Sequence, residues 1–236
     1  MLVKTQAIVF SAIKYQEKSL VVKCFTEDFG LKTYFVPNAF SGKKNNQKIA
    51  FFQPLTFLEI EANHKNQTLN YFKEIKIEYP FQSIPFVITK SSIAIFLAEI
   101  LNHAIKEEEK NQSLFTFLKT ALIWLDTHNE TQNFHLVFLL QLTKFLGFYP
   151  AKSQQELPFF ELTEGIFSIV ETPSCLTEYE TLLLKKTMEL KFDSSQKMFT
   201  NTERQLLLKN ILEYYNIHLH GFKKPNSLAV LKEVFS

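Results

Sequence analysis

The sequence predicts an α+β protein in which a small all-β module is followed by a larger helical region. Two patterns predict this fold class. Up to about residue 79, short runs rich in β-branched and aromatic residues are separated by polar turns, which is typical of strands. After Tyr79-Pro80, apolar residues recur at every third or fourth position, as they do on one face of a helix. We therefore expect two domains, residues 1–80 and residues 81–236.

The N-terminal part contains five expected strands. They cover residues 7–13, 20–26, 31–36, 51–61 and 69–78. Gly30 ends the turn between the second and third strands and is free to take a positive φ. Residues 37–48 form a polar loop, and Pro54 indicates an edge or a bulge in the fourth strand. Five consecutive strands suit a small closed barrel of the oligonucleotide-binding (OB) type, although an SH3-like barrel or a small sandwich fits the same pattern.

The C-terminal part contains six expected helices. They cover residues 92–105, 114–127, 132–148, 177–190, 202–220 and 227–235. Residues 107–109, all glutamate, are expected to form the solvated end of the first helix, and Gly147 with Pro150 closes the third. Between the third and fourth helices, residues 151–174 form an irregular insertion with a small hairpin near 162–166.

Composition removes several classes of enzyme. The chain has five glycines, and no two lie closer than twelve residues, so GxGxxG, GxxxxGK and GxSxG motifs are all excluded. Cys24 and Cys175 are the only cysteines, and no CxxC, HxxxH or DxD pattern occurs. His218 and His220 would point about 200° apart on a helix, so they cannot share an ion. We expect a binding protein rather than an enzyme, with no metal and no cofactor.

The chain also lacks the sequence features of an exported or membrane-spanning protein. No apolar run approaches the roughly 20 residues that cross a bilayer. The first residues do not resemble a secretory signal, and two cysteines are too few for a disulfide framework. We therefore expect a cytoplasmic protein that makes no contact with a membrane.

Positive charge is concentrated near the N-terminus. The whole chain carries a net charge of +2, but residues 1–80 hold eleven lysines against seven carboxylates, an excess that favours a polyanion-binding module. Of the 26 basic residues only Arg204 is arginine. Lysine binds phosphate as a mobile point charge and does not read bases as arginine does, so weak sequence preference is expected. A lysine-rich solvated surface is the alternative interpretation.

Two groups of lysines are candidate polyanion contacts. The first group lies around the first turn, the long loop and the middle strands of the expected barrel: Lys14, Lys18, Lys32, Lys43, Lys44 and Lys48. Tyr34 and Phe35 lie near the same middle strands, and OB barrels bind nucleic acid with this face and its flanking loops. The second group, Lys223 and Lys224, follows the penultimate helix, where cations also satisfy a helix C-terminus.

Six segments, in order along most of the chain, match one known family: residues 7–31, 38–44, 53–60, 74–81, 144–150 and 212–224. In the first segment Tyr15, Glu17, Thr26 and Gly30 fall at a characteristic spacing. The chain thus resembles the RecO family of bacterial DNA repair proteins, which are recombination mediators. There is one departure. Many members carry a four-cysteine zinc module where residues 151–180 contain only Cys175, so the hairpin looks like its replacement.

The resemblance implies a protein that binds single- and double-stranded DNA and anneals complementary strands. It implies partnership with RecR in loading the recombinase RecA onto strands coated by single-strand-binding protein, in the cytoplasm and associated with the nucleoid. No catalytic residue is required. The lysines of the first group would contact phosphates, and Lys223 and Lys224 would extend the same track.

Two other functions remain open at this point. The first is a protein-interaction scaffold whose barrel is only structural and whose helices bind partner peptides. Phe134 breaks the apolar stripe of its helix and is a candidate to line an exposed groove for such a peptide. The second is a nuclease or hydrolase whose scattered glutamates meet in space, although no motif supports it.

Overall fold

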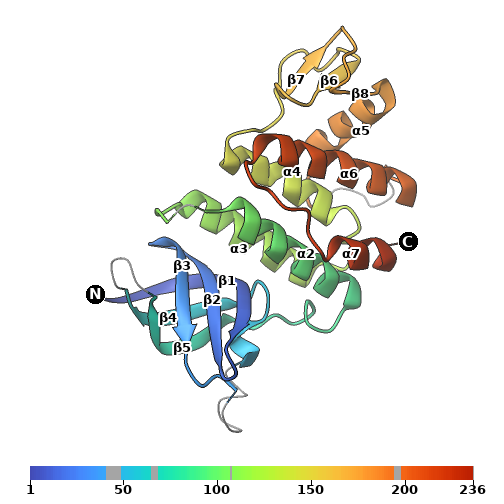
Figure 1. Ribbon diagram of the computed structural model, residues 1–236. Helices are drawn as coiled ribbons and strands as arrows, with labels where there is room; N and C mark the ends of the chain where they lie inside the picture. The colour runs from blue at the N-terminus through green and yellow to red at the C-terminus, as the bar shows by residue number, and fades with distance from the viewer. Residues whose placement is uncertain (41–48, 65–68, 107, 194–197, 236) are drawn as a thin grey trace. The chain divides into compact units, whose positions relative to one another are not determined.

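The computed structural model describes residues 1–40, 49–64, 69–106, 108–193 and 198–235. Among these residues the chain forms two sheets, six α-helices and one short 3₁₀ helix, so the α+β class is confirmed (Figure 1). The chain divides into two compact units, Met1–Thr127 and His128–Ser236. The first unit contains the larger sheet and two helices, and the second contains the other helices and the smaller sheet.

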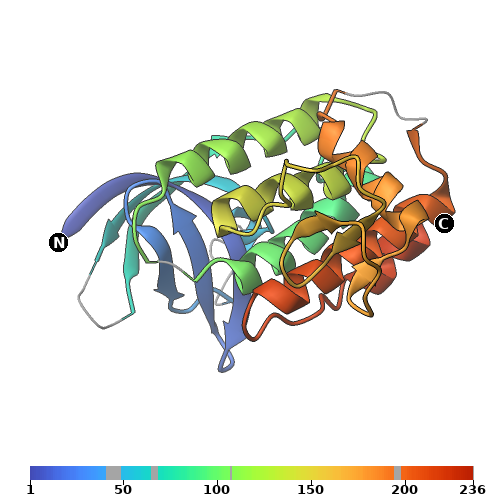
Figure 2. The ribbon, with the colours of Figure 1, turned by 90° about the horizontal axis from the view of Figure 1, so that it is seen from above.

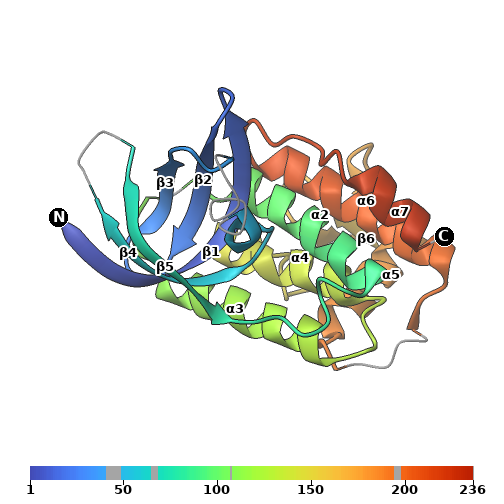
Figure 3. The same ribbon diagram turned by 90° about the horizontal axis from the view of Figure 1, so that it is seen from below.

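The first unit is built on five antiparallel strands. They are β1 (Leu2–Tyr15), β2 (Ser19–Thr26), β3 (Gly30–Val36), β4 (Phe57–Asn63) and β5 (Tyr71–Tyr79). Figure 3 shows the five strands from below, and neighbouring strands follow the order β3-β2-β1-β4-β5. A parallel bridge between Tyr34 and Asn70 joins the two edges. This connectivity is that of the OB fold, which decides between the alternatives that the strand pattern left open.

Strand β1 is longer than predicted because its two halves pair with different neighbours. Leu2 to Ile8 pair with β4, and Ala7 to Tyr15 pair with β2. The register with β2 shifts between Val9 and Ser11. A bulge of this kind bends a strand and increases its twist. Figure 2 shows β1 as a long curved ribbon, which allows one strand to serve two sides of the barrel.

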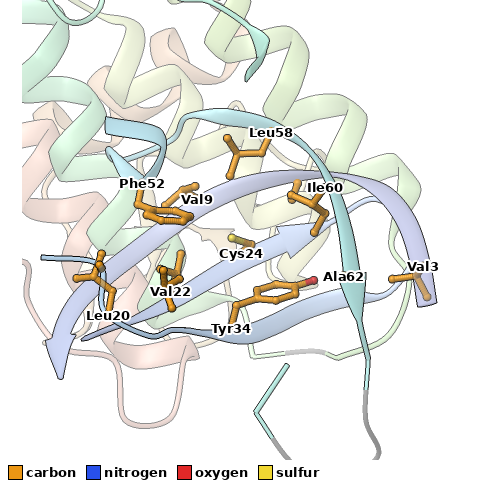
Figure 4. Packing of buried hydrophobic residues seen from close by; sticks show 13 residues of the cluster. Val3, Val9, Leu20, Val22, Cys24, Tyr34, Phe52, Leu58, Ile60 and Ala62 are labelled. Atoms are coloured by element: carbon orange, nitrogen blue, oxygen red, sulfur yellow. The ribbon is translucent and has the colours of Figure 1, made fainter. Parts of the chain in front are cut away.

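Alternate residues of the strands fill the barrel (Figure 4). Val22 and Cys24 of β2 and Tyr34 of β3 are fully buried. The Tyr34 ring stacks on Phe72 with 4.2 Å between centroids, and Phe72 also stacks on Phe52 at 5.6 Å. Each large side chain buried here stabilises the fold by about 1.5–3 kcal/mol, so the register that directs these residues inward is strongly specified.

The predicted fourth strand, residues 51–61, is wrong in its first half. Ala50–Phe52 form the 3₁₀ helix η1, and β4 begins only at Phe57. Between them Leu55 adopts a left-handed backbone (φ 62°), and its N–H donates to the Val9 carbonyl at 2.8 Å. A residue in this conformation cannot continue an extended strand, so the apolar run turns instead.

The turn between β2 and β3 depends on Thr26 and Gly30. Gly30 has the positive φ expected from the sequence, 65°. The buried Thr26 hydroxyl donates to the Gly30 carbonyl at 2.8 Å and accepts the Phe29 N–H at 3.1 Å. A Cβ on Gly30 would lie 2.3 Å from the carbonyl oxygen of Glu109, so the backbone can approach only a glycine here.

Two helices, α2 (Ile88–Ala104) and α3 (Gln112–Thr127), complete the first unit. Because α2 ends at Ala104, the prediction that the glutamate run forms its end is wrong for Glu108 and Glu109, the two that the structure describes. Their backbone instead lies against the β2–β3 turn. Tertiary packing onto that turn, rather than helix propensity, decides where this segment runs.

A buried carboxylate, that of Asp126 in α3, anchors the segment that leaves the barrel. It accepts the backbone N–H groups of Gln82, Ser83 and Ile84 at 2.9, 2.8 and 3.0 Å. Lys90 of α2 is also buried, and its ammonium donates to the Ser83 hydroxyl at 2.7 Å and to the main-chain carbonyl of Asp126 at 2.9 Å. This network, the Asp126 anchor, ties the chain after β5 to both helices of the unit.

The second unit comprises α4 (Phe134–Leu146), β6 (Phe159–Glu161), β7 (Ile166–Ser168), β8 (Cys175–Leu176), α5 (Glu178–Glu189), α6 (Asn201–His218) and α7 (Leu228–Val234). Capping boxes begin two of the helices: Thr177 with Glu180 at α5, and Thr200 with Glu203 at α6. Gly147 ends α4 in the left-handed conformation (φ 85°), as predicted.

The predicted hairpin in the insertion is confirmed as β6 and β7, with β8 added beside β6. Phe160 packs on Phe167 and Tyr214, with ring centroids 5.1 and 5.7 Å apart, so apolar contacts hold the hairpin to α6. The prediction that Phe134 lines an exposed groove is wrong. Phe134 is 2% exposed and stacks on Phe192, because α4 is buried on nearly all sides and has no solvent-facing stripe.

Candidate nucleic-acid interface

Lys14 and Lys18 lie together at the β1–β2 hairpin. Lys14 is on β1 opposite Leu20, Lys18 is in the turn, and both are exposed. The Lys14 ammonium lies 5.4 Å from the ring centroid of Phe40, and the Phe40 N–H donates to the Lys18 carbonyl at 3.2 Å. No ion pair involves either lysine among the described residues. Both ammonium groups are therefore available to an anion.

Lys43, Lys44 and Lys48 lie outside the described residues. Their assignment as phosphate contacts therefore stays a prediction.

Lys32 is placed differently from the hairpin lysines. It pairs with Cys24 near the last residue of β2, whereas Lys14 pairs with Leu20 near the first. Its ammonium lies 3.4 Å from a carboxylate oxygen of Glu108, and its side chain is only 21% exposed. The structure does not bring Lys32 together with the hairpin lysines, and its contact with phosphate stays a prediction.

Lys223 and Lys224 are exposed and follow α6 in the second unit. Nearby, the His218 ring stacks on Phe148 with 5.1 Å between centroids, and its Nε2 lies 2.8 Å from the Leu162 carbonyl oxygen. His218 thus connects α6 to the segment between β6 and β7 and does not lie free on the surface. The role of the two lysines in extending a DNA track stays a prediction.

Three aromatic side chains, which we call the aromatic row, lie on the outside of the barrel. Tyr15 ends β1, Phe35 is on β3, and Tyr71 begins β5. The Phe35 ring meets Tyr15 at 6.1 Å and Tyr71 at 6.0 Å between centroids, both edge to face. Tyr15 is 49% exposed and Tyr71 is 39% exposed. Because successive strand residues point to opposite faces, the buried Tyr34 is enough to predict that Phe35 points outward. The contact between Phe35 and Tyr71 could not be predicted in this way, since it depends on the closure of β3 on β5.

Behind the aromatic row, the Tyr34 hydroxyl and His64 Nε2 form a hydrogen bond of 2.8 Å. Burial, and then the positive charges of Lys32 and the N-terminus, lower the pKa of His64. Burial also raises the pKa of Tyr34. Both groups are therefore neutral near pH 7, and the pair supports the barrel wall without adding charge to the surface.

The family models described as Recombination protein O N terminal and Recombination protein O C terminal match residues 1–81 and 85–228. This chain belongs to the RecO family of DNA repair proteins. The DNA repair protein RecO of Flavobacterium psychrophilum is 63% identical over 238 residues, and that of Flavobacterium johnsoniae is 59% identical over 237, each match covering 100% of both chains. The RecO of Porphyromonas gingivalis is 27% identical over 244 residues, covering 98% of this chain and 99% of that protein.

The resemblance drawn from the sequence is therefore confirmed for the family. In the described part of this RecO-family chain, no group of three or more His, Cys, Asp or Glu side chains could hold a metal ion. No helix within the described ranges is long and apolar enough to cross a membrane. Cys24 is buried in the barrel, where burial raises the pKa of its thiol and makes it unreactive.

Proposed function

We propose that this chain is a non-enzymatic recombination mediator that binds single- and double-stranded DNA without sequence specificity. In this proposal it anneals complementary strands and, with RecR, helps to load RecA onto strands coated by single-strand-binding protein, in the cytoplasm at the nucleoid. Membership of the RecO family supports the role. We assign the main DNA-binding surface to the OB domain, residues 1–80. Residues 81–236 form the helical domain, in which Lys223 and Lys224 would extend the DNA track.

The observation that carries DNA binding is the pair of exposed lysines on the hairpin of an OB barrel. Lys14 and Lys18 have no ion-pair partner among the described residues. Each phosphate that a lysine neutralises releases condensed counterions, which favours binding regardless of sequence. Neutralisation also lowers the repulsion between two strands, and flexible ammonium groups let the bases search for their register. Annealing in this scheme makes and breaks no covalent bond.

The test is a DNA titration over a range of salt concentrations with the Lys14→Ala/Lys18→Ala variant. A second variant adds alanine at Lys43, Lys44 and Lys48. Each lost phosphate contact should lower the slope of log affinity against log salt by about 0.7–0.9. Affinity should fall similarly for unrelated sequences and for single and double strands. Lys209→Ala/Lys232→Ala, which removes two exposed lysines from α6 and α7, is the charge-matched control.

If DNA affinity and its salt dependence are unchanged in both barrel variants, these lysines do not contact DNA. Absence of any binding by the wild-type protein at low salt would instead favour the scaffold alternative. Strand annealing, followed with two labelled complementary oligonucleotides, should slow in the barrel variants in step with affinity. Divalent-metal-dependent cleavage of the DNA by the wild-type protein would contradict the non-enzymatic assignment.

A further inference from the structure

The barrel has an open seam beside the aromatic row. Strands β3 and β5 are joined around Asn70, whose N–H donates to the Thr33 carbonyl at 3.1 Å and whose carbonyl accepts the Phe35 N–H at 2.8 Å. Beyond this point no further ladder joins them among the described residues. A groove of about 430 Å³ lies there between residues 35–39 and residues 71–75, with Phe51 in its lining.

The groove and the aromatic row are continuous, because Phe35 and Tyr71 belong to both. Phe35 touches the ring on either side of it, so contacts within the row hold all three rings in place. Rings that are already ordered lose little conformational freedom when a ligand stacks on them. The row is therefore a preorganised apolar surface that remains accessible to solvent at Tyr15 and Tyr71.

Among the described residues, the charged side chains that line the groove are already paired, which argues against a phosphate inside it. Lys73 lines the groove, but its ammonium lies 2.5 Å from a carboxylate oxygen of Glu61. Glu74, another lining residue, is paired as well, with a carboxylate oxygen 2.9 Å from the Lys76 ammonium. Lys14 and Lys18 have no ion-pair partner among the described residues, and Lys14 directly precedes Tyr15 in β1, where successive side chains point to opposite faces of the strand. A ligand that matches both the aromatic row and the lysines of the β1–β2 hairpin has a flat, uncharged part next to the row and an anionic part next to the lysines.

We propose that the aromatic row stacks the unpaired bases of single-stranded DNA and that the groove between β3 and β5 receives one of them. The inference rests on the proposed function and assigns a separate task to each set of residues. The lysines contact phosphates, which single strands and duplexes share. The row contacts base faces, which a duplex keeps stacked inside itself, so this surface selects single strands over duplex.

The experiment compares two single strands that differ only in their bases. One is an oligothymidylate of about 16 nucleotides, the upper site size of one OB barrel, and the other is an abasic strand with the same number of phosphates. The wild-type protein should bind the oligothymidylate more tightly. The Tyr15→Ala/Tyr71→Ala variant should lose that preference, with affinity for the oligothymidylate falling about tenfold or more. Its affinity for duplex and its salt slope should stay unchanged.

Two further variants keep the test specific. Tyr15→Phe/Tyr71→Phe keeps both rings and should bind both strands like the wild type. Phe86→Ala, which removes a ring that is 81% exposed in the segment before α2, should also leave binding unchanged. Thermal melting of each variant establishes that the fold is retained, and the phenylalanine variant provides a ring-retaining control if the alanine variant is destabilised.

Three results would overturn the proposal. The first is equal affinity of the wild type for the two strands, and the second is an alanine variant that still prefers the oligothymidylate. The third is loss of the preference in the phenylalanine variant, which would assign the effect to the hydroxyl groups. If the lysine variants weaken DNA binding while the tyrosine variants do not, the base-stacking proposal is wrong and the proposed function stands. If the wild type binds no DNA, the proposed function fails as well.

Discussion

Replacing Asp126 by alanine should destabilise the first unit more than any single substitution at its surface. The side chain is 3% exposed and accepts three backbone N–H groups from the segment that leaves the barrel. Asp126→Ala removes the common acceptor of all three donors. The Ser83 hydroxyl, which also contacts this carboxylate at 3.2 Å, loses one of its partners.

The magnitude follows from the number of donors left without an acceptor. Each buried donor that loses its acceptor costs about 1–3 kcal/mol, and the N–H of Ile84 is buried. Water can reach the N–H groups of Gln82 and Ser83 in part, and the three effects are not additive. We therefore expect a loss of about 3–4 kcal/mol in the free energy of unfolding. For a unit of this length the melting temperature should fall by roughly 10–15 °C.

The assay is thermal unfolding by circular dichroism, with urea titration for the free energy. Asp193→Ala is the matched control, because it removes an exposed aspartate from the second unit and should change stability by less than about 0.5 kcal/mol. If Asp126→Ala is no more destabilised than Asp193→Ala, the anchor does not hold the barrel exit as we argue.

The Asp126 anchor also predicts how stability depends on pH. Burial alone would raise the pKa of the Asp126 carboxyl, but backbone hydrogen bonds from Gln82, Ile84 and Ser83 outweigh it and hold the pKa below its usual value. The stabilising contribution is therefore present above the unfolded pKa, about 3.9, and is lost as pH falls through the lower folded pKa. Melting temperatures of wild type and Asp126→Asn, measured from about pH 7 to about pH 3, should converge at the acidic end. A difference that is constant over this range would contradict the reasoning.

Three substitutions elsewhere test local geometry by urea titration. Gly30→Ala adds a Cβ 2.3 Å from the Glu109 carbonyl oxygen at a positive φ, and should cost about 2–4 kcal/mol. Gly147→Ala meets no atom within 4 Å, so only its left-handed backbone is strained and the loss should be about 1 kcal/mol. Equal losses in the two glycine variants would refute the role given to the Glu109 contact. Tyr215→Phe removes a buried hydroxyl that donates to the Leu139 carbonyl at 2.7 Å, and should lower the free energy of unfolding of the second unit by about 1–2 kcal/mol. An unchanged midpoint of urea unfolding would refute this role of the hydroxyl.

Local patterns were enough to predict most of the fold. The five barrel strands, the helical second part and the hairpin of the insertion follow from residue periodicity and turn residues. Gly30 and Gly147 were assigned correctly, because a positive φ at a turn or a helix end favours glycine whatever surrounds it. The resemblance to the RecO family also rested on short segments of sequence. The exposed lysines of the first turn were found in the same way, since a charged side chain in a turn is solvated without help from the rest of the fold.

The errors share one cause, which is contact between residues that are distant along the chain. Leu55 turns the chain before β4 because its N–H meets the Val9 carbonyl, and Phe134 is buried against Phe192, which lies in the segment after α5. No property of the residues next to them reveals either contact. For the same reason the pattern extended the fourth strand too far and expected an exposed groove at Phe134.

The sequence by itself determined the fold class, the family and the two exposed lysines at the first turn of the barrel. The tertiary structure alone decided that Tyr15, Phe35 and Tyr71 form one row, that Lys32 faces Glu108, and that Asp126 anchors residues about forty positions earlier. The physical reason is that periodicity assigns a side chain to one face of its own strand or helix. Which faces then meet depends on register and closure, and these are set by the packing of the whole unit.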